Sequence, residues 1–179
     1  DNATLMGCYK SSPSSNAVPA AILVSFNSTP VPSSASIPAI GGSLRVLGGS
    51  YMMGDALGDI RRDEVPVHHV RLDAFTISRT EVSKEDWDAV RDKANLLNKG
   101  YQISPGTVSC PPSDSSNSKK YPVVGIAWEE ALKWCNAKSE KEGLTPVYEA
   151  SGAVYKTGQS VPTLNSSSNG YRLPREKEW

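Results

Sequence analysis

The sequence lacks a net charge, a long hydrophobic run and any closely spaced pair of cysteines. Nineteen basic side chains balance nineteen acidic ones over 179 residues, so no overall field selects DNA, RNA or an anionic membrane. The longest apolar stretch, residues 17–26, is interrupted by Pro19 and Ser25 and falls well short of the ~20 residues of a membrane span. We therefore expect neither a nucleic-acid partner nor a membrane span.

The three cysteines, at positions 8, 110 and 135, form no C-x-x-C pair, which argues against a zinc site and a full disulfide framework. Cys135 lies on a helical apolar stripe, and we expect it to be a buried small hydrophobe. Cys110 lies in a loop and is either free or paired with Cys8. Cys8 also ends a Leu-Met-Gly-Cys tetrapeptide similar to that of bacterial lipoprotein signals. No apolar segment precedes it, which favours a chance match, with a lipid anchor as the alternative.

Residues 1–43 form a predicted N-terminal arm. They are rich in Ser, Pro, Ala and Val, and their charged side chains are Asp1 and Lys10. This composition is typical of an extended or poorly ordered spacer. The apolar run at residues 20–26 is also compatible with a strand that docks on the domain. Residues 44–179 carry the remaining charged groups and form the predicted domain.

Short runs of alternating apolar and polar residues open this domain. They predict strands at residues 44–47 and 50–54 with a glycine bend between them, then strands at 67–72 and 75–78 joined by a tight corner. His68 and His69 are adjacent in a predicted strand, so they point to opposite faces and cannot ligate one metal ion together. Hydrogen bonding is the commoner role for such histidines.

Ser83, with Asp86 three residues later, forms an approximate capping box that predicts the start of a first helix. The apolar stripe and the solvated face of this helix are then expected at regular spacing. The predicted stripe is Trp87, Val90, Ala94 and Leu97, and the predicted solvated face is Asp88, Arg91, Asp92 and Lys93.

A second helix, after a short strand within residues 122–126, is the predicted organiser of the core. Its first turn carries Glu129 and Glu130, where the positive end of the helix favours them, and it stops near Gly143. Two tryptophans on one short helix require a large partner surface, since each buries roughly 150–250 Å². The predicted apolar stripe is Trp128, Ala131, Leu132 and Cys135.

Two long loops, at residues 98–120 and 151–170, are predicted from their Gly, Pro, Ser and Asn content. The second contains one short β-turn-β element around Val154 and Tyr155. Pro174 suits the first turn of a helix that the last residues continue. A helix of six residues cannot stand alone, so we expect the natural protein to continue beyond Trp179.

Six stretches, in order, resemble the formylglycine-generating-enzyme or sulfatase-modifying-factor domain, a branch of the C-type-lectin-like folds. They are GGSYMMG at 48–54, DEVPVHHVRLDAF at 63–75, ISRTEVS at 77–83, PVVGIAWEEA at 122–131, CN at 135–136 and GYRLPREKEW at 170–179. At two positions the sequence differs from the usual family pattern; both differences weaken a helix cap, and neither removes a reactive residue. Ala127 stands where the family usually has a capping Ser, and Arg175 where it usually has Thr.

The resemblance implies an α+β domain of the C-type-lectin-like type, with short strands, two main helices and much irregular structure. It also implies that residues 44–179 are the N-terminal part of such a domain. In the oxidase members, the reactive thiol pair and the calcium sites lie in the second half, and none of the three cysteines matches that pair. We therefore assign no catalytic, cofactor-binding or metal-ligating residue, and calcium is implied only for the part that would follow.

The resemblance also gives mechanical expectations. We expect Arg172 to be a buried or half-buried guanidinium satisfied by carboxylate or carbonyl partners. Glu81, which ends a predicted strand, is one candidate partner. The alternative is that Glu81 is a surface charge next to a helix cap.

Two functions fit the resemblance. One is a non-catalytic ligand-binding or display scaffold on an exported surface protein, like the variable proteins of diversity-generating retroelements, whose variable residues lie near the C-terminus. Its partner would be a protein or cell-surface ligand. The alternative is a formylglycine-generating oxidase or a related oxidative sulfur enzyme acting on cysteine. We favour binding because the arm is typical of an exposed spacer and no reactive constellation is visible. A plain structural domain is a third possibility.

Overall fold

The computed structural model describes residues 24–25, 42–55, 65–108 and 119–178. Most of the Ser- and Pro-rich arm lies outside these residues, as do Cys8, Cys110 and the lipoprotein-like tetrapeptide. The predicted division into an arm and a domain at residue 43 stays a prediction.

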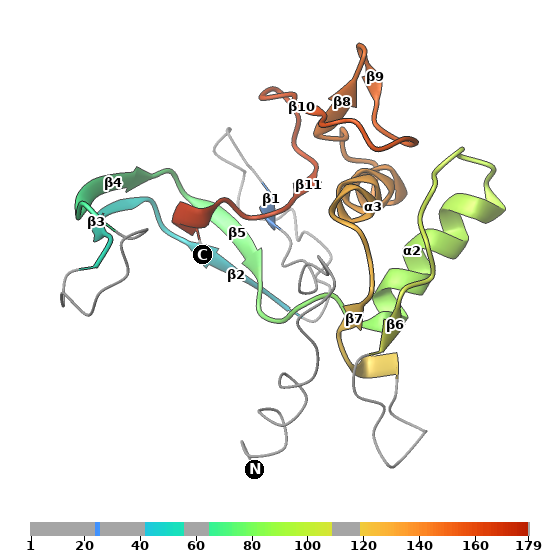
Figure 1. Cartoon of the computed structure of the whole chain (residues 1–179), viewed down its shortest axis with the longest axis horizontal. Helices are drawn as coiled ribbons and strands as arrows, with labels where there is room; N and C mark the ends of the chain where they lie inside the picture. Colours follow the sequence, from blue (N-terminus) through green and yellow to red (C-terminus); the bar gives the residue numbers. More distant parts are fainter. Residues whose placement is uncertain (1–23, 26–41, 56–64, 109–118, 179) are drawn as a thin grey trace.

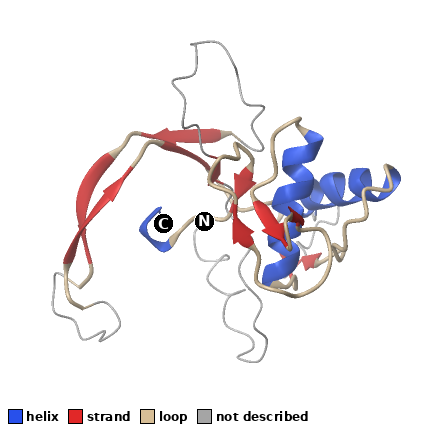
Figure 2. Ribbon diagram, turned by 90° about the horizontal axis from the view of Figure 1, so that it is seen from above, coloured by secondary structure: helices blue, strands red, loops and turns tan. Residues whose placement is uncertain are grey.

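Residues 43–53 and 68–78 form one long antiparallel ribbon with a bend in the middle (Figures 1 and 2). β3 (Gly49–Met53) pairs with β4 (His68–Leu72), and β2 (Ser43–Val46) pairs with β5 (Phe75–Ser78) in the same continuous register. Gly48 lies at the bend, where a β-carbon would lie 3.1 Å from the Leu72 carbonyl oxygen. This close approach of the two backbones confirms the predicted glycine bend.

A four-stranded sheet joins distant parts of the chain. β1 (Val24–Ser25) pairs with β5 on one side and with β11 (Tyr171–Arg172) on the other, giving the antiparallel order β11-β1-β5-β2. The described part of the apolar run at residues 20–26 therefore docks as a strand. This sheet brings the end of the described chain beside its beginning (Figure 1).

The first helix, α2 (Lys84–Leu96), begins as predicted. The Asp86 amide donates a hydrogen bond of 3.1 Å to the Ser83 hydroxyl oxygen, which caps the helix. Trp87, Val90 and Ala94 are buried, but Leu97 is 52% exposed, so its place in the apolar stripe was predicted wrongly. Leu97 is the C-terminal cap residue, where the helical repeat has already ended. The predicted charged face forms ion pairs of Asp88 with Lys84 and Arg91, and of Arg91 with Asp92.

The second helix, α3 (Trp128–Lys141), is buried along residues 131–139, as its predicted role in the core requires. Leu132 and Cys135 are buried, but Trp128 is 38% exposed, which corrects its predicted place in the core. Trp128 is the first residue of the helix and precedes the buried segment. Gly143, with φ +73°, follows the helix as predicted.

The large aromatic partner of the first helix is Trp134. Its ring stacks on that of Trp87, with centroids 5.5 Å apart and planes 1° from parallel. The Trp134 indole N–H donates to the Trp87 carbonyl at 3.0 Å, and the Trp87 indole N–H donates to the Ser104 carbonyl at 2.8 Å. Both rings are therefore buried with their polar edges satisfied, and their contact joins α2 to α3. Figure 1 shows the course of these two helices.

Asn136 and Ser139 attach two more segments to α3. The Asn136 amide group donates to the carbonyls of Tyr148 and Tyr155, and its oxygen accepts from the amides of Val147 and Tyr148, all at 2.8–3.1 Å. The Ser139 hydroxyl accepts from the Tyr171 amide at 2.8 Å. A β-carbon at Gly170 would collide with the Ser139 side chain, so a glycine permits this approach.

The remaining strands are short. β8 (Tyr148–Ala150) lies between β9 (Ala153–Val154) and β10 (Thr163–Leu164), and β6 (Thr107–Val108) pairs with β7 (Val123–Val124). The predicted β-turn-β element is the β8–β9 hairpin. The described chain closes with a 3-10 turn, η3 (Glu176–Glu178), where a helix was predicted. Short strands, two helices and much irregular structure make the fold α+β, as expected.

Arg172 is buried as predicted, but its carboxylate partner is Glu178 and not Glu81. Two nitrogens of the guanidinium donate to the two Glu178 oxygens at 2.6 Å each, and the side chains are 2% and 3% exposed. The Glu178 carboxylate also accepts from the Arg175 amide at 2.8 Å. The η3 turn brings Glu178 back onto β11, a contact that spacing along the chain does not reveal.

Trp134→Ala should lower the free energy of unfolding by about 3–5 kcal/mol, because it removes a fully buried ring and its stacking partner's contact. Trp128→Ala, on the same helix, should lower it by less than about 1 kcal/mol, because this ring is partly exposed. Urea unfolding followed by far-ultraviolet circular dichroism measures both. Equal losses would contradict the assignment of Trp134 as the core ring.

Glu178→Gln should cost about 3 kcal/mol at pH 7, because it removes the carboxylate charge that forms two hydrogen bonds with a buried guanidinium. Burial raises the pKa of the Glu178 carboxyl, but the hydrogen bonds from Arg172 and the Arg175 amide outweigh burial and hold this pKa below its usual range. The pair therefore stabilises fully above the unfolded pKa of about 4.3, and this stabilisation is lost as the pH falls through the folded pKa.

Urea unfolding at pH 7 and pH 3 should thus show a difference between wild type and Glu178→Gln that shrinks in acid. Glu176→Gln, on the exposed side of the same turn, is the matched control and should follow the wild type at both values. A difference that grows in acid would rule out the depressed pKa.

Candidate functional site

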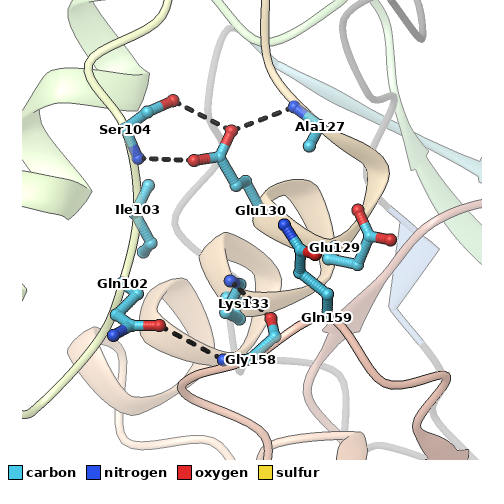
Figure 3. Close-up of a pocket in the computed structure, with 9 residues that line it drawn as sticks. All are labelled: Gln102, Ile103, Ser104, Ala127, Glu129, Glu130, Lys133, Gly158 and Gln159. Carbon is cyan, nitrogen blue, oxygen red and sulfur yellow. Dashed lines mark hydrogen bonds between the residues drawn. The ribbon is translucent and has the colours of Figure 1, made fainter. Parts of the chain in front are cut away.

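A groove of about 730 Å³ lies beside the first turns of α3 (Figure 3). One wall is the loop at residues 102–104, and the other is formed by Gly158 and Gln159. The helix supplies the base. The lining residues are Gln102, Ile103, Ser104, Ala127, Glu129, Glu130, Lys133, Gly158 and Gln159.

Glu130 holds the first wall. One oxygen of its carboxylate accepts from the Ser104 amide at 3.0 Å, and the other accepts from the Ser104 hydroxyl and the Ala127 amide at 2.9 Å each (Figure 3). Ala127 begins the helix without a side-chain cap, as predicted, and the bond from its amide to Glu130 supplies half of a capping box. The Glu130 charge also lies at the positive end of α3.

Lys133, one turn further along α3, holds the second wall. Its side chain is buried, with 4% of the residue exposed, and its ammonium donates to the Gly158 carbonyl at 3.1 Å. The same carbonyl accepts from the Tyr155 hydroxyl at 2.9 Å, and the Gly158 amide donates to the Gln102 side-chain oxygen at 3.2 Å (Figure 3). Gly158 has φ +85°, a conformation that favours glycine. Both walls are therefore fastened to one helix.

Three polar groups of the lining remain available to a ligand: the Glu129 carboxylate, the Gln159 side chain and the Gln102 amide nitrogen. No hydrogen bond or ion pair within the described chain involves the Glu129 or Gln159 side chain, and Figure 3 draws neither with such a bond. Glu129 is half-buried. Burial and then the Glu129 charge raise the pKa of Tyr155.

The residues weighed from the sequence as reactive or metal-binding lie elsewhere. Cys135 is buried inside α3, and burial raises the pKa of its thiol well above the usual range, so it stays a protonated core residue. His68 and His69 are exposed on β4. Across the described ranges, no group of three His, Cys, Asp or Glu side chains could hold a metal ion, and no helix is long and apolar enough to cross a membrane.

Sequence reasoning identified Glu129 and Glu130 only as charges at a helix start, and it did not single out Lys133. One signal was present: Lys133 and Asn136 interrupt a helix whose predicted neighbours are apolar. Buried polar side chains usually have partners, so polar residues on a core helix indicate attachment points.

Short antiparallel strands, two packed helices and much irregular structure are consistent with a C-type-lectin-like α+β scaffold. A family model described as the sulfatase-modifying factor enzyme 1-like domain matches residues 29–179, and the chain belongs to this family. The resemblance inferred from the six sequence stretches is thereby confirmed.

Two solved structures and one curated protein are similar to this chain. The crystal structure of CarF is 28% identical, with a TM-score of 0.59 over 77% of this chain and 54% of that one. Treponema denticola variable protein 1 is 24% identical, with a TM-score of 0.54 over 84% and 55%, which shows the shared fold. Chaperone protein LppX of Paenibacillus barcinonensis is 30% identical over 62% of this chain and 36% of its own length. The chain therefore spans about a third to a half of these proteins.

Glu130→Ala should lower the free energy of unfolding by about 1–3 kcal/mol, because three donors lose their acceptor. Amide hydrogen exchange at Ser104 and Ala127 should accelerate in the same variant. Glu129→Ala is the matched control, one residue earlier in the same turn, and should leave both amides protected. Unchanged exchange in Glu130→Ala would show that the first wall is held by other contacts.

Proposed function

We propose that this chain is a non-catalytic ligand-binding or display scaffold of an exported surface protein. The observation that carries the proposal is the groove on α3, whose two walls are held by Glu130 and Lys133. The Glu129 and Gln159 side chains in its lining form no hydrogen bond or ion pair with another residue that the structure describes. A site whose shape is held by the fold loses little conformational entropy on binding. The ligand would be a protein or another cell-surface molecule.

The alternative function, oxidation of a cysteine to formylglycine, requires a reactive thiol pair or a redox metal. The burial of Cys135 in α3 supports the binding proposal, because it removes this thiol from contact with a substrate. Cys8 and Cys110 lie outside the described residues, so the thiol chemistry must be tested directly.

The relatives also favour binding. One structural neighbour is named a variable protein, and the curated relative carries the name of a chaperone, a class of protein that binds other proteins. Because this chain spans about half or less of each, the activity of the whole protein is part of the proposal. The groove adds a recognition site to the C-terminal variable residues implied by the resemblance.

Titration of the isotopically labelled chain with mixed short peptides tests the proposal. The amide signals of Gln102, Ser104, Gly158 and Gln159 should shift, because these residues line the groove. Ala127→Trp, which fills the groove mouth, should abolish the shifts. Ala153→Trp, an equal change at an exposed position on β9, should keep them. Absence of shifts, or shifts confined to other surfaces, would contradict the proposal.

Oxygen consumption with a cysteine-containing sulfatase-motif peptide tests the alternative. The full chain should consume no oxygen above the peptide background. Turnover that depends on thiols and is lost in a Cys8→Ala, Cys110→Ala double variant would support the oxidase instead. Cys135→Ala is the control for a buried thiol and should not alter either result.

A further inference from the structure

The charges in the groove indicate the chemistry of its ligand, on the basis of the binding function proposed above. Its lining carries Glu129, Glu130 and Lys133, and no ion pair joins any of these three to another described residue. Glu130 is neutralised in part by three hydrogen bonds from uncharged donors. The two carboxylates and one ammonium leave the groove with a net negative charge.

Glu129 would ordinarily pair with Lys133, because residues four apart are neighbours on a helix surface. Lys133 instead donates to the Gly158 carbonyl and lies over the Tyr155 ring, with 5.7 Å from its nitrogen to the ring centre. Because Lys133 is bonded to the second wall, the half-buried Glu129 carboxylate has no cationic partner within the described part of the chain. A carboxylate in this state favours a ligand that brings the missing positive charge.

The uncharged polar groups of the groove could form hydrogen bonds with the main chain of a bound peptide. The Gln102 side chain presents an amide donor, because its oxygen accepts from the Gly158 amide, and the Gln159 side chain presents both a donor and an acceptor. These groups complement the C=O and N–H groups of a peptide. The lining contains no aromatic ring on which a flat apolar ligand could stack. Its volume of about 730 Å³ lies in the range of pockets that enclose a small ligand, roughly 300–1,000 Å³.

We propose that the groove binds an extended peptide segment through an arginine side chain, with the guanidinium on the Glu129 carboxylate and the adjoining main chain on Gln102 and Gln159. A guanidinium presents two parallel N–H groups that match both oxygens of one carboxylate, and it is more weakly hydrated than an ammonium. Both properties suit a half-buried acceptor.

The probes are three acetylated, amidated pentapeptides of the form Gly-Gly-X-Gly-Gly, where X is arginine, citrulline or glutamate. Citrulline has nearly the shape of arginine but no charge. Isothermal titration of the full chain should show binding of the arginine peptide at least about tenfold tighter than the citrulline peptide, because a charged hydrogen bond replaces a neutral one. The arginine affinity should fall with added salt.

Glu129→Gln should remove the preference for arginine while citrulline binding stays the same. Glu85→Gln is the matched control: it removes the same charge from the first turn of α2, outside the groove, and should keep the full preference. Thermal unfolding of both variants checks that they fold like the wild type.

Equal binding of arginine and citrulline would overturn the inferred ligand class while leaving the groove as a binding site. Tighter binding of the glutamate peptide would overturn it in favour of an acidic ligand. Absence of binding by all three would also overturn it, and the mixed-peptide titration would then decide separately whether the groove binds anything. A preference for arginine that survives in Glu129→Gln would place the cation elsewhere.

Discussion

Hydrogen bonds from one helix hold the loops of this domain in place. Four polar side chains of α3, each three residues after the last, are bonded to four different segments: Glu130 to residue 104, Lys133 to residue 158, Asn136 to residues 147–155 and Ser139 to residue 171. Three residues turn a helix through about 300°, so each of these side chains points about 60° away from the direction of the one before it. Over the three steps the direction changes by about 180°, from one side of the helix to the opposite side. One helix can therefore fasten loops around half its circumference.

This arrangement explains how a domain with little regular structure keeps a single conformation. Strands of two or three residues cannot hold a sheet by themselves, and the β8–β9 hairpin would be marginal if isolated. Asn136 compensates by donating two hydrogen bonds and accepting two at the base of that hairpin. A side-chain amide has two N–H groups, so both of its donors are used. The stacked Trp87 and Trp134 rings provide the apolar contact against which the helix is placed.

The features predictable from the sequence were the local ones. The helices, the glycine bend at Gly48 and the buried Cys135 follow from periodicity and turn chemistry over a few residues. Trp128 was assigned to the core wrongly because a periodic pattern does not show where burial begins along a helix. The pairing of Arg172 with Glu178 depends on the η3 turn, which brings Glu178 back to β11. The spacing of the two residues along the sequence does not predict this turn. Lys133 escaped notice because hydrophobic periodicity treats a polar residue as outward-facing, whereas here its ammonium is bonded inward.

The same row of bonds separates residues that maintain the fold from residues that would contact the ligand proposed above. Glu130 and Lys133 are committed to the groove walls, so their replacement would alter the fold before it altered specificity. Glu129 and Gln159 line the same groove and form no hydrogen bond or ion pair with another described residue, so substitutions there would change the chemistry of the groove at little cost in stability. A scaffold that displays different ligand-binding groups needs this separation, because variation is tolerated only at positions whose partners are outside the protein. The groove on α3 has that property within a few residues of one helix turn.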